Sequence, residues 1–146
     1  MGRIVVGVDG SENSAAALEW AIGEARVRGA TVEAVLGWHE PIMGGTAAVM
    51  IPVDTREFEE SYRAQLDKAV DAVVGGIGDL GGVEIDRQLV HAPAARSLLD
   101  AAVDADLLVV GRRGHGGFLG LVLGSISQQV VWHAPCPVVV VPAPGS

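Results

Sequence analysis

The sequence predicts an α/β protein built on a doubly wound, five-stranded parallel sheet with helices on both faces. Strand-like and helix-like segments alternate from one end of the chain to the other, which is typical of this Rossmann-like class. No linker, repeat or low-complexity segment interrupts the alternation, and 146 residues are about the size of one ordinary domain. We therefore expect a single domain over residues 1–146, with the strand order 3-2-1-4-5.

The first third of the chain predicts two strands joined by a helix. The apolar run IVVGV within Arg3 to Asp9 indicates the first strand, and Thr31 to Trp38 indicates the second. Between them a helix is expected to begin at Ser11 or Ser14 as N-cap and to end at Gly29. Its apolar side chains recur at helical spacing: Leu18, Ala21, Ile22 and Ala25.

The middle of the chain predicts a loop, an amphipathic helix and a third strand. The segment from Pro41 to Thr55 is expected to be a loop, and a helix follows from Arg56 to Val74, ended by glycines 75, 76 and 78. One face of that helix carries Phe58, Tyr62, Leu66, Ala69 and Val73. Alternating apolar residues from Val83 to Leu89 predict a strand that is half exposed or near a sheet edge.

The last third predicts two more helices and two more strands. A helix is expected to begin at Pro93, with a buried face formed by Leu98, Leu99, Ala102 and Val103. The run DLLVVG, Asp106 to Gly111, indicates a buried strand. A final helix starts at Gly124, and PVVVVP, Pro137 to Pro142, indicates the last strand.

The composition argues against several kinds of partner. A net charge of −8 and a pI near 4.8 disfavour nucleic-acid and membrane-surface binding, which need clustered Lys and Arg. The apolar run at the N-terminus is short and is broken by Asp9, so we expect no signal sequence or membrane span and a cytoplasmic location. The single Cys136 allows no internal disulfide, and the four histidines lack the spacing of a metal site.

A glycine-rich loop is the segment most suggestive of chemistry. In doubly wound sheets ligands bind at the carboxyl ends of the strands, which selects Asp9-Gly10-Ser11 and the segment from Gly111 onward. That segment reads GRRGHGG and reaches a helix start at Gly124-Ser125. Glycines let a ligand approach the main chain, the helix start offers free N–H groups, and Arg112, Arg113 and His115 add donors, all of which favour an anion such as a triphosphate. A flexible surface loop before a glycine-capped helix is the alternative.

Other nucleotide and phosphate sites do not match the sequence. A Walker loop needs a lysine after its last glycine, whereas the only lysine here is Lys68, within a predicted helix. The segments that follow the strands also lack the residues of a receiver domain, a flavodoxin or a G-x-S-x-G hydrolase. A P-loop ATPase is therefore excluded.

The spacing G-x2-G-x9-G-[ST], formed by Gly111, Gly114, Gly124 and Ser125, is that of the ATP-binding universal stress proteins, which this chain resembles. The resemblance extends to IVVGVDGS, to HAPAARSLLDAAVDADLLVVGRRG and to GSISQQVVWHAPCPVVVVP, and leaves out only Pro41 to Thr55. It implies that Asp9, beside Gly7 and Val8, contacts the adenine or ribose, with backbone groups of residues 36–38 near the adenine. It also implies that Gly111, Arg113 and Gly114 meet the ribose and phosphates. The end of the phosphate chain would be enclosed by Gly124, Ser125 and Ile126. Asp9 has a competing role as a helix-capping acid.

The resemblance implies a regulatory ATP-binding module in the stress response rather than an optimised enzyme, and no catalytic set is evident in the sequence. A slow ATPase using Mg²⁺ or Mn²⁺ held by the phosphates, a binder of another adenine nucleotide such as cyclic AMP, and a dimeric scaffold with an empty site are the alternatives. A homodimer is expected through the last strand, whose residues Val138, Val139, Val140 and Val141 form an apolar run at a predicted sheet edge.

Overall fold

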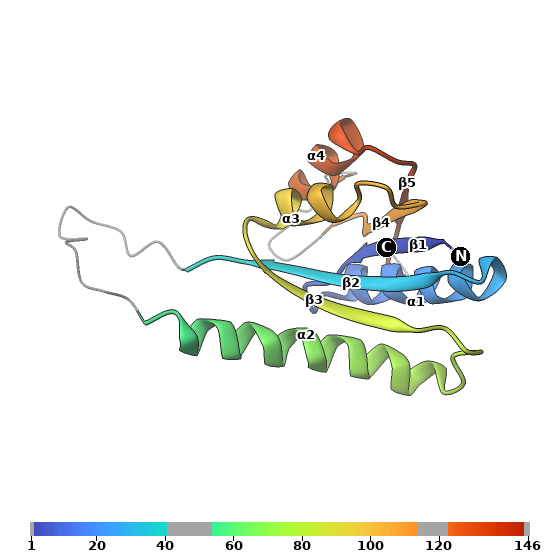
Figure 1. The fold of residues 1–146 in the computed structure, drawn as a ribbon, viewed down its shortest axis with the longest axis horizontal. Coiled ribbons are helices and arrows are strands. Elements are labelled where there is room, and N and C mark those ends of the chain that lie inside the picture. Colours follow the sequence, from blue (N-terminus) through green and yellow to red (C-terminus); the bar gives the residue numbers. More distant parts are fainter. Residues whose placement is uncertain (1, 41–53, 114–122, 145–146) are drawn as a thin grey trace.

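The computed structural model describes residues 2–40, 54–113 and 123–144, and these form one parallel sheet with helices on both faces (Figure 1). The sheet order is β3-β2-β1-β4-β5, so the predicted fold class and strand order are confirmed. The strands are β1 (Arg3–Gly7), β2 (Thr31–Trp38), β3 (Ile85–His91), β4 (Leu107–Gly111) and β5 (Val138–Val141). The helices are α1 (Glu12–Arg28), α2 (Arg56–Ile77), α3 (Ala94–Ala101) and α4 (Ser125–His133).

The sheet separates two apolar clusters. Helices α1 and α2 cover one face and helices α3 and α4 cover the other (Figure 1). Successive residues of a strand point to opposite faces, so Ile4 and Val6 pack toward α1 and α2, whereas Val5 packs toward α3 and α4. The almost fully apolar β1 and β4 are the strands buried on both sides.

Local signals fix the ends of α1. Ser11 is the N-cap, and its Oγ accepts a hydrogen bond of 3.2 Å from the Ser14 N–H. Ser14, the other candidate, lies inside the helix and is buried. Gly29 ends the helix in the left-handed conformation, with φ 68°, as predicted.

Two predicted boundaries and one predicted buried residue are wrong. Helix α2 continues through Gly75 and Gly76 and ends only at Gly78, because the extra turn carries Ile77 onto the core. Strand β3 begins at Ile85 rather than at Val83. Val103 is 54% exposed, because α3 stops at Ala101 and leaves it in the following turn.

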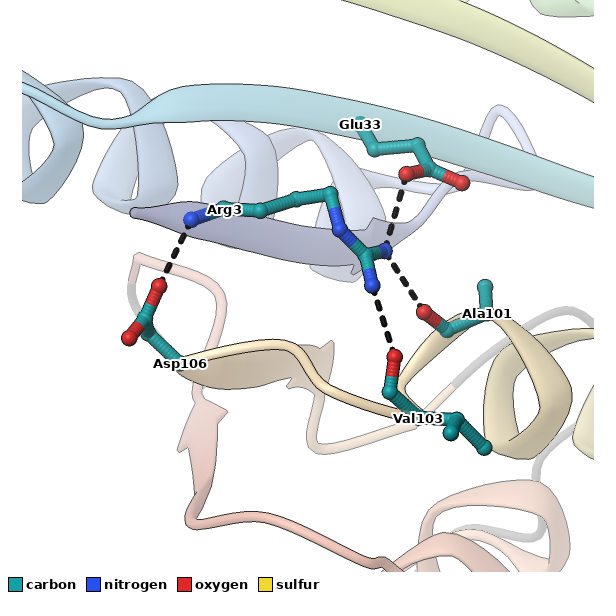
Figure 2. Close-up of polar contacts among 5 residues, drawn as sticks. All are labelled: Arg3, Glu33, Ala101, Val103 and Asp106. Atoms are coloured by element: carbon teal, nitrogen blue, oxygen red, sulfur yellow. Dashed lines mark hydrogen bonds and ion pairs between the residues drawn. The ribbon is translucent and has the colours of Figure 1, made fainter. Parts of the chain in front are cut away.

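Arg3, at the amino end of β1, is hydrogen-bonded to the turn that follows α3 (Figure 2). Its guanidinium donates to the carbonyl oxygens of Ala101 and Val103, each at 2.7 Å, and pairs with Glu33 of β2 at 3.0 Å. Its backbone N–H donates to Asp106 at 2.7 Å. A cation at the carbonyl end of a helix satisfies exposed acceptors and opposes the negative end of the helix dipole, so Arg3 stabilises the junction of β1, β2, α3 and β4.

Candidate functional site

The carboxyl ends of β1, β2 and β4 meet the starts of α1, α3 and α4 around a pocket of about 110 Å³. It lies where the strand order reverses between β1 and β4, the position at which doubly wound sheets bind ligands. The residues that line it are Gly7, Val8, Asp9, Ser14, Val35, Leu36, Gly37, Ala94, Leu98, Val110, Gly111, Arg113, Ile126 and Ser127.

Three glycines let the surrounding elements pack closely at this end of the sheet. A Cβ atom at Gly7 would lie 2.9 Å from a methyl group of Leu98, and one at Gly111 would lie 2.8 Å from the main chain of Asn13. At Gly37 it would come within 2.8 Å of the Ala92 carbonyl oxygen. A side chain at Gly37 or Gly111 would meet main-chain atoms, and one at Gly7 would require Leu98 to move, so the three glycines allow the elements around the pocket to pack closely.

Asp9 is held in one conformation by hydrogen bonds from both its backbone and its side chain. Its backbone N–H donates to the Ser14 Oγ at 3.2 Å, and its carboxylate accepts from the Ser11 N–H at 2.9 Å. Its carbonyl oxygen accepts from the Gln65 side chain of α2 at 2.8 Å. The carboxylate therefore supports the turn into α1. Asp9 also lines the pocket, so one residue has both a structural role and a position beside the ligand site.

The two ends of the glycine-rich loop are joined at the start of α4. The Gly124 N–H donates to the Arg112 carbonyl oxygen at 2.8 Å, and Gly124, in extended conformation, is the N-cap of the helix. The buried Ser127 hydroxyl donates to the Gly111 carbonyl oxygen at 2.7 Å. These bonds anchor the first turn of α4, with its free N–H groups, beside the end of β4.

Most of the residues that the sequence selected lie in one place. Six of them line the pocket: Gly7, Val8, Asp9, Gly111, Arg113 and Ile126. Arg112, Gly124 and Ser125 adjoin it through the end of β4 and the start of α4, and Gly114 lies outside the described residues. Leu36 and Gly37, from the segment expected near the adenine, also line it, whereas sequence reasoning missed the polar lining residues Ser14 and Ser127.

A larger hollow of about 580 Å³ lies between α1 and α2. Its walls are mostly small apolar side chains such as Ala15, Ala69 and Ala72, and the charged residues that line it within the described ranges are Glu12 and Glu19. Two carboxylates disfavour a phosphate group, because like charges repel. The strand-end pocket, which Arg113 and the start of α4 border, is therefore the better candidate for an anionic ligand.

Other features of the described residues bear on metals and membranes. Among residues 2–40, 54–113 and 123–144, no group of three or more His, Cys, Asp or Glu side chains could hold a metal ion. Within the same ranges, no helix has the length and apolar character needed to cross a bilayer.

The arrangement defines a class of α/β proteins in which a glycine-bordered pocket lies at the switch point of a parallel sheet. Within this class, the chain belongs to the universal stress protein family, whose model matches residues 1–142.

Two relatives illustrate the range of the family. A universal stress protein of Mycolicibacterium smegmatis is 32% identical over 138 residues, which are 94% of this chain and 47% of that protein. A universal stress protein of Thermus aquaticus is 34% identical over 140 residues, covering 94% of this chain and 96% of that protein. The chain thus spans about half the length of the mycobacterial relative and nearly all of the Thermus one.

Two solved structures are similar along almost the whole chain. A universal stress protein in complex with cAMP is 26% identical, with a TM-score of 0.69 and coverage of 97% of both chains. The universal stress protein from Archaeoglobus fulgidus in complex with dAMP is also 26% identical, with a TM-score of 0.64 and coverage of 97% of this chain and 98% of that one.

Proposed function

We propose that this protein is a regulatory adenine-nucleotide-binding module and that ATP is its nucleotide. The observation that carries the proposal is the convergence of Asp9, Gly111 and the first turn of α4 on one pocket at the switch point. A carboxylate and the N–H groups of a helix start together suit a ligand with hydroxyl groups at one end and phosphate at the other.

The two similar structures with bound nucleotide support an adenine nucleotide as the ligand. Their ligands, cAMP and dAMP, share an adenine base, a sugar and one phosphate. The choice of ATP rests on the spacing of Gly111, Gly114, Gly124 and Ser125, which resembles that of the ATP-binding universal stress proteins. In this proposal Gly7, Val8 and Asp9 hold the adenosine half.

The phosphates belong at the other side of the pocket. Arg113 supplies a guanidinium, and the N–H groups of Ser125 and Ile126 at the start of α4 supply directed donors. A Mg²⁺ or Mn²⁺ ion would be carried by the phosphates, and it would offset their charge. The chain's own part is to bind and orient the nucleotide, so occupancy of the pocket rather than turnover is the regulatory event.

A variant pair at Asp9 tests the proposal. Asp9→Asn keeps an oxygen that can accept from the Ser11 N–H but loses the charge, whereas Asp9→Ala loses both. We expect the wild type to bind ATP in calorimetry. We expect Asp9→Asn to weaken ATP binding about tenfold, as for a lost charged hydrogen bond, at a nearly unchanged melting temperature. We expect Asp9→Ala to lower both the ATP affinity and the melting temperature. Wild-type protein that binds neither ATP nor cAMP would show that the proposed ligand is wrong, and sustained phosphate release would favour an ATPase instead.

We also propose a homodimer, paired through the outer edge of β5. The strand lies at the edge of the sheet, next to β4.

A further inference from the structure

We infer that Gln65 is a positioning residue of the nucleotide site, which brings α2 into that site although α2 lines no part of the pocket within the described ranges. Its side-chain Nε2 donates to the Asp9 carbonyl oxygen at 2.8 Å, across 56 positions of sequence. Because Asp9 borders the pocket, this bond fixes the main chain that presents Val8 and Asp9 to the ligand. The inference rests on the proposed function and adds to it a residue that the glycine spacing does not include.

The bond differs in kind from the local bonds of the Asp9 turn. Two other polar groups of Asp9 are held by neighbours on the same turn, with the N–H on Ser14 and the carboxylate on Ser11. Both of these bonds would move with the turn as a unit. Gln65 belongs to a separate helix, α2, so its bond sets where the turn lies relative to that helix.

Gln65 is itself placed by tightly packed neighbours. The next residue, Leu66, is fully buried in the cluster between α1, α2 and the sheet. One turn earlier, Tyr62 stacks on the buried Trp38 at the end of β2, with ring centroids 5.7 Å apart. Because these neighbours hold α2 in place, Gln65 reaches Asp9 from a fixed position on the helix, which is the property of a supporting residue that preorganises a site.

The orientation of the amide follows from its partner. A carbonyl oxygen can only accept, so the group that faces Asp9 must be the Gln65 amide nitrogen. Gln65→Glu would keep the shape but place an acceptor against an acceptor, while Gln65→Leu would remove the bond without adding charge. Gln88, exposed on the edge strand β3 and away from the pocket, offers the same two substitutions as matched controls.

The experiment measures ATP affinity by calorimetry and amide hydrogen exchange of the ligand-free protein for these four variants. In Gln65→Leu and Gln65→Glu we expect ATP binding to weaken about five- to tenfold, as for one lost hydrogen bond. Exchange should quicken at the Asp9 and Ser11 amides but not in β1 or β4. The Gln88 variants should match the wild type in both measurements.

The outcomes separate this inference from the proposed function. A wild type that binds no adenine nucleotide overturns the proposed function, and this inference with it. A wild type that binds ATP, with Gln65→Leu binding equally tightly, overturns this inference alone. Weakened binding accompanied by faster exchange throughout the sheet also overturns it, since Gln65 would then act only on overall stability.

Discussion

The indole of Trp38 and the imidazole of His91 are stacked with ring centroids 4.2 Å apart and planes 13° apart, which ties the last residues of β2 and β3 together. The same imidazole bonds through Nε2 to the Glu40 carboxylate at 2.8 Å. This hydrogen bond, with one from Glu40's own backbone, holds the pKa of Glu40 below its usual value of 4.5.

The first prediction is that replacing His91 returns the pKa of Glu40 toward its usual value. A carboxylate whose pKa is lowered in the folded state stabilises the protein above its unfolded pKa, and this contribution is lost as the pH falls through the folded pKa. The stabilisation by Glu40 should therefore be complete above about pH 4.5 and disappear in more acidic solution. Carbon-13 NMR titration of the Glu40 carboxyl should show a higher midpoint in His91→Phe, which has no donor. Identical midpoints in the two proteins would contradict the assignment.

The second prediction is that replacement by alanine has opposite effects on stability at Gly23, inside α1, and at Gly29, which follows its last residue. Gly23 lies inside the helix, and a Cβ atom added there would meet no atom within 4 Å, so Gly23→Ala should raise the free energy of unfolding by about 0.5–1 kcal/mol. Gly29 has equally open surroundings but a φ of 68°, so Gly29→Ala should lower it by about 1 kcal/mol. Urea titrations measure both values, and a change of the same sign at the two sites would refute the backbone explanation.

The positions of Gly75 and Gly76 show where sequence patterns suffice for the fold and where they fail. Alternation, caps and helical spacing predicted each strand and helix that the structure describes, because each pattern reflects a local periodicity of side-chain burial. The end of α2 was mispredicted because two helical glycines cost about 1 kcal/mol each. Burying the side chains near Ile77 offsets that cost. Such a balance depends on tertiary contacts, so local propensity could not reveal it.

The third prediction concerns Arg3, whose side chain pairs with Glu33 and with two carbonyl oxygens (Figure 2) and which is not among the residues that line the pocket. Arg3→Met removes its bonds to the carbonyl oxygens of Ala101 and Val103 and should cost about 2 kcal/mol of stability. The matched control is Arg96→Met on α3, where the pair with Asp100 is 3.7 Å long and exposed, and it should change stability by less than about 0.5 kcal/mol. Thermal unfolding measures both, and equal losses would mean that the Arg3 bonds add nothing.

The candidate site was predictable only in its local parts. The glycine spacing indicates Gly111 and Gly124. The position of Asp9 at the end of the first strand indicates that residue, because ligands of parallel sheets bind at the carboxyl ends of the strands. The bond between Gln65 and Asp9 joins two elements that are distant in sequence, and it depends on how α2 lies on the sheet. Neither residue belongs to a sequence pattern that would indicate the bond.

The last prediction begins with the contrast between the two edges of the sheet. The β3 edge carries the polar Asp86, Arg87 and Gln88, and charged side chains of this kind discourage pairing with another chain. The β5 edge carries only valines. Its side chains are divided between the two faces, with Val139 and Val141 packed toward α1 and Val138 and Val140 toward α3 and α4. A lysine at any of the four would therefore disturb the core as well as an interface.

The backbone of β5 offers a cleaner test of the homodimer. Leu108 and Arg112 donate to the carbonyl oxygens of Pro137 and Val141, each at 2.9 Å, so in a parallel ladder the backbone groups of Val140 point away from β4. Val140→Pro should thus remove a donor that only a second copy would use, and light scattering at micromolar concentration should fall from twice the chain mass to one. Val139→Pro, whose N–H faces β4, should instead lower the melting temperature. A monomeric wild type, or a folded Val140→Pro variant that stays dimeric, would refute pairing through this edge.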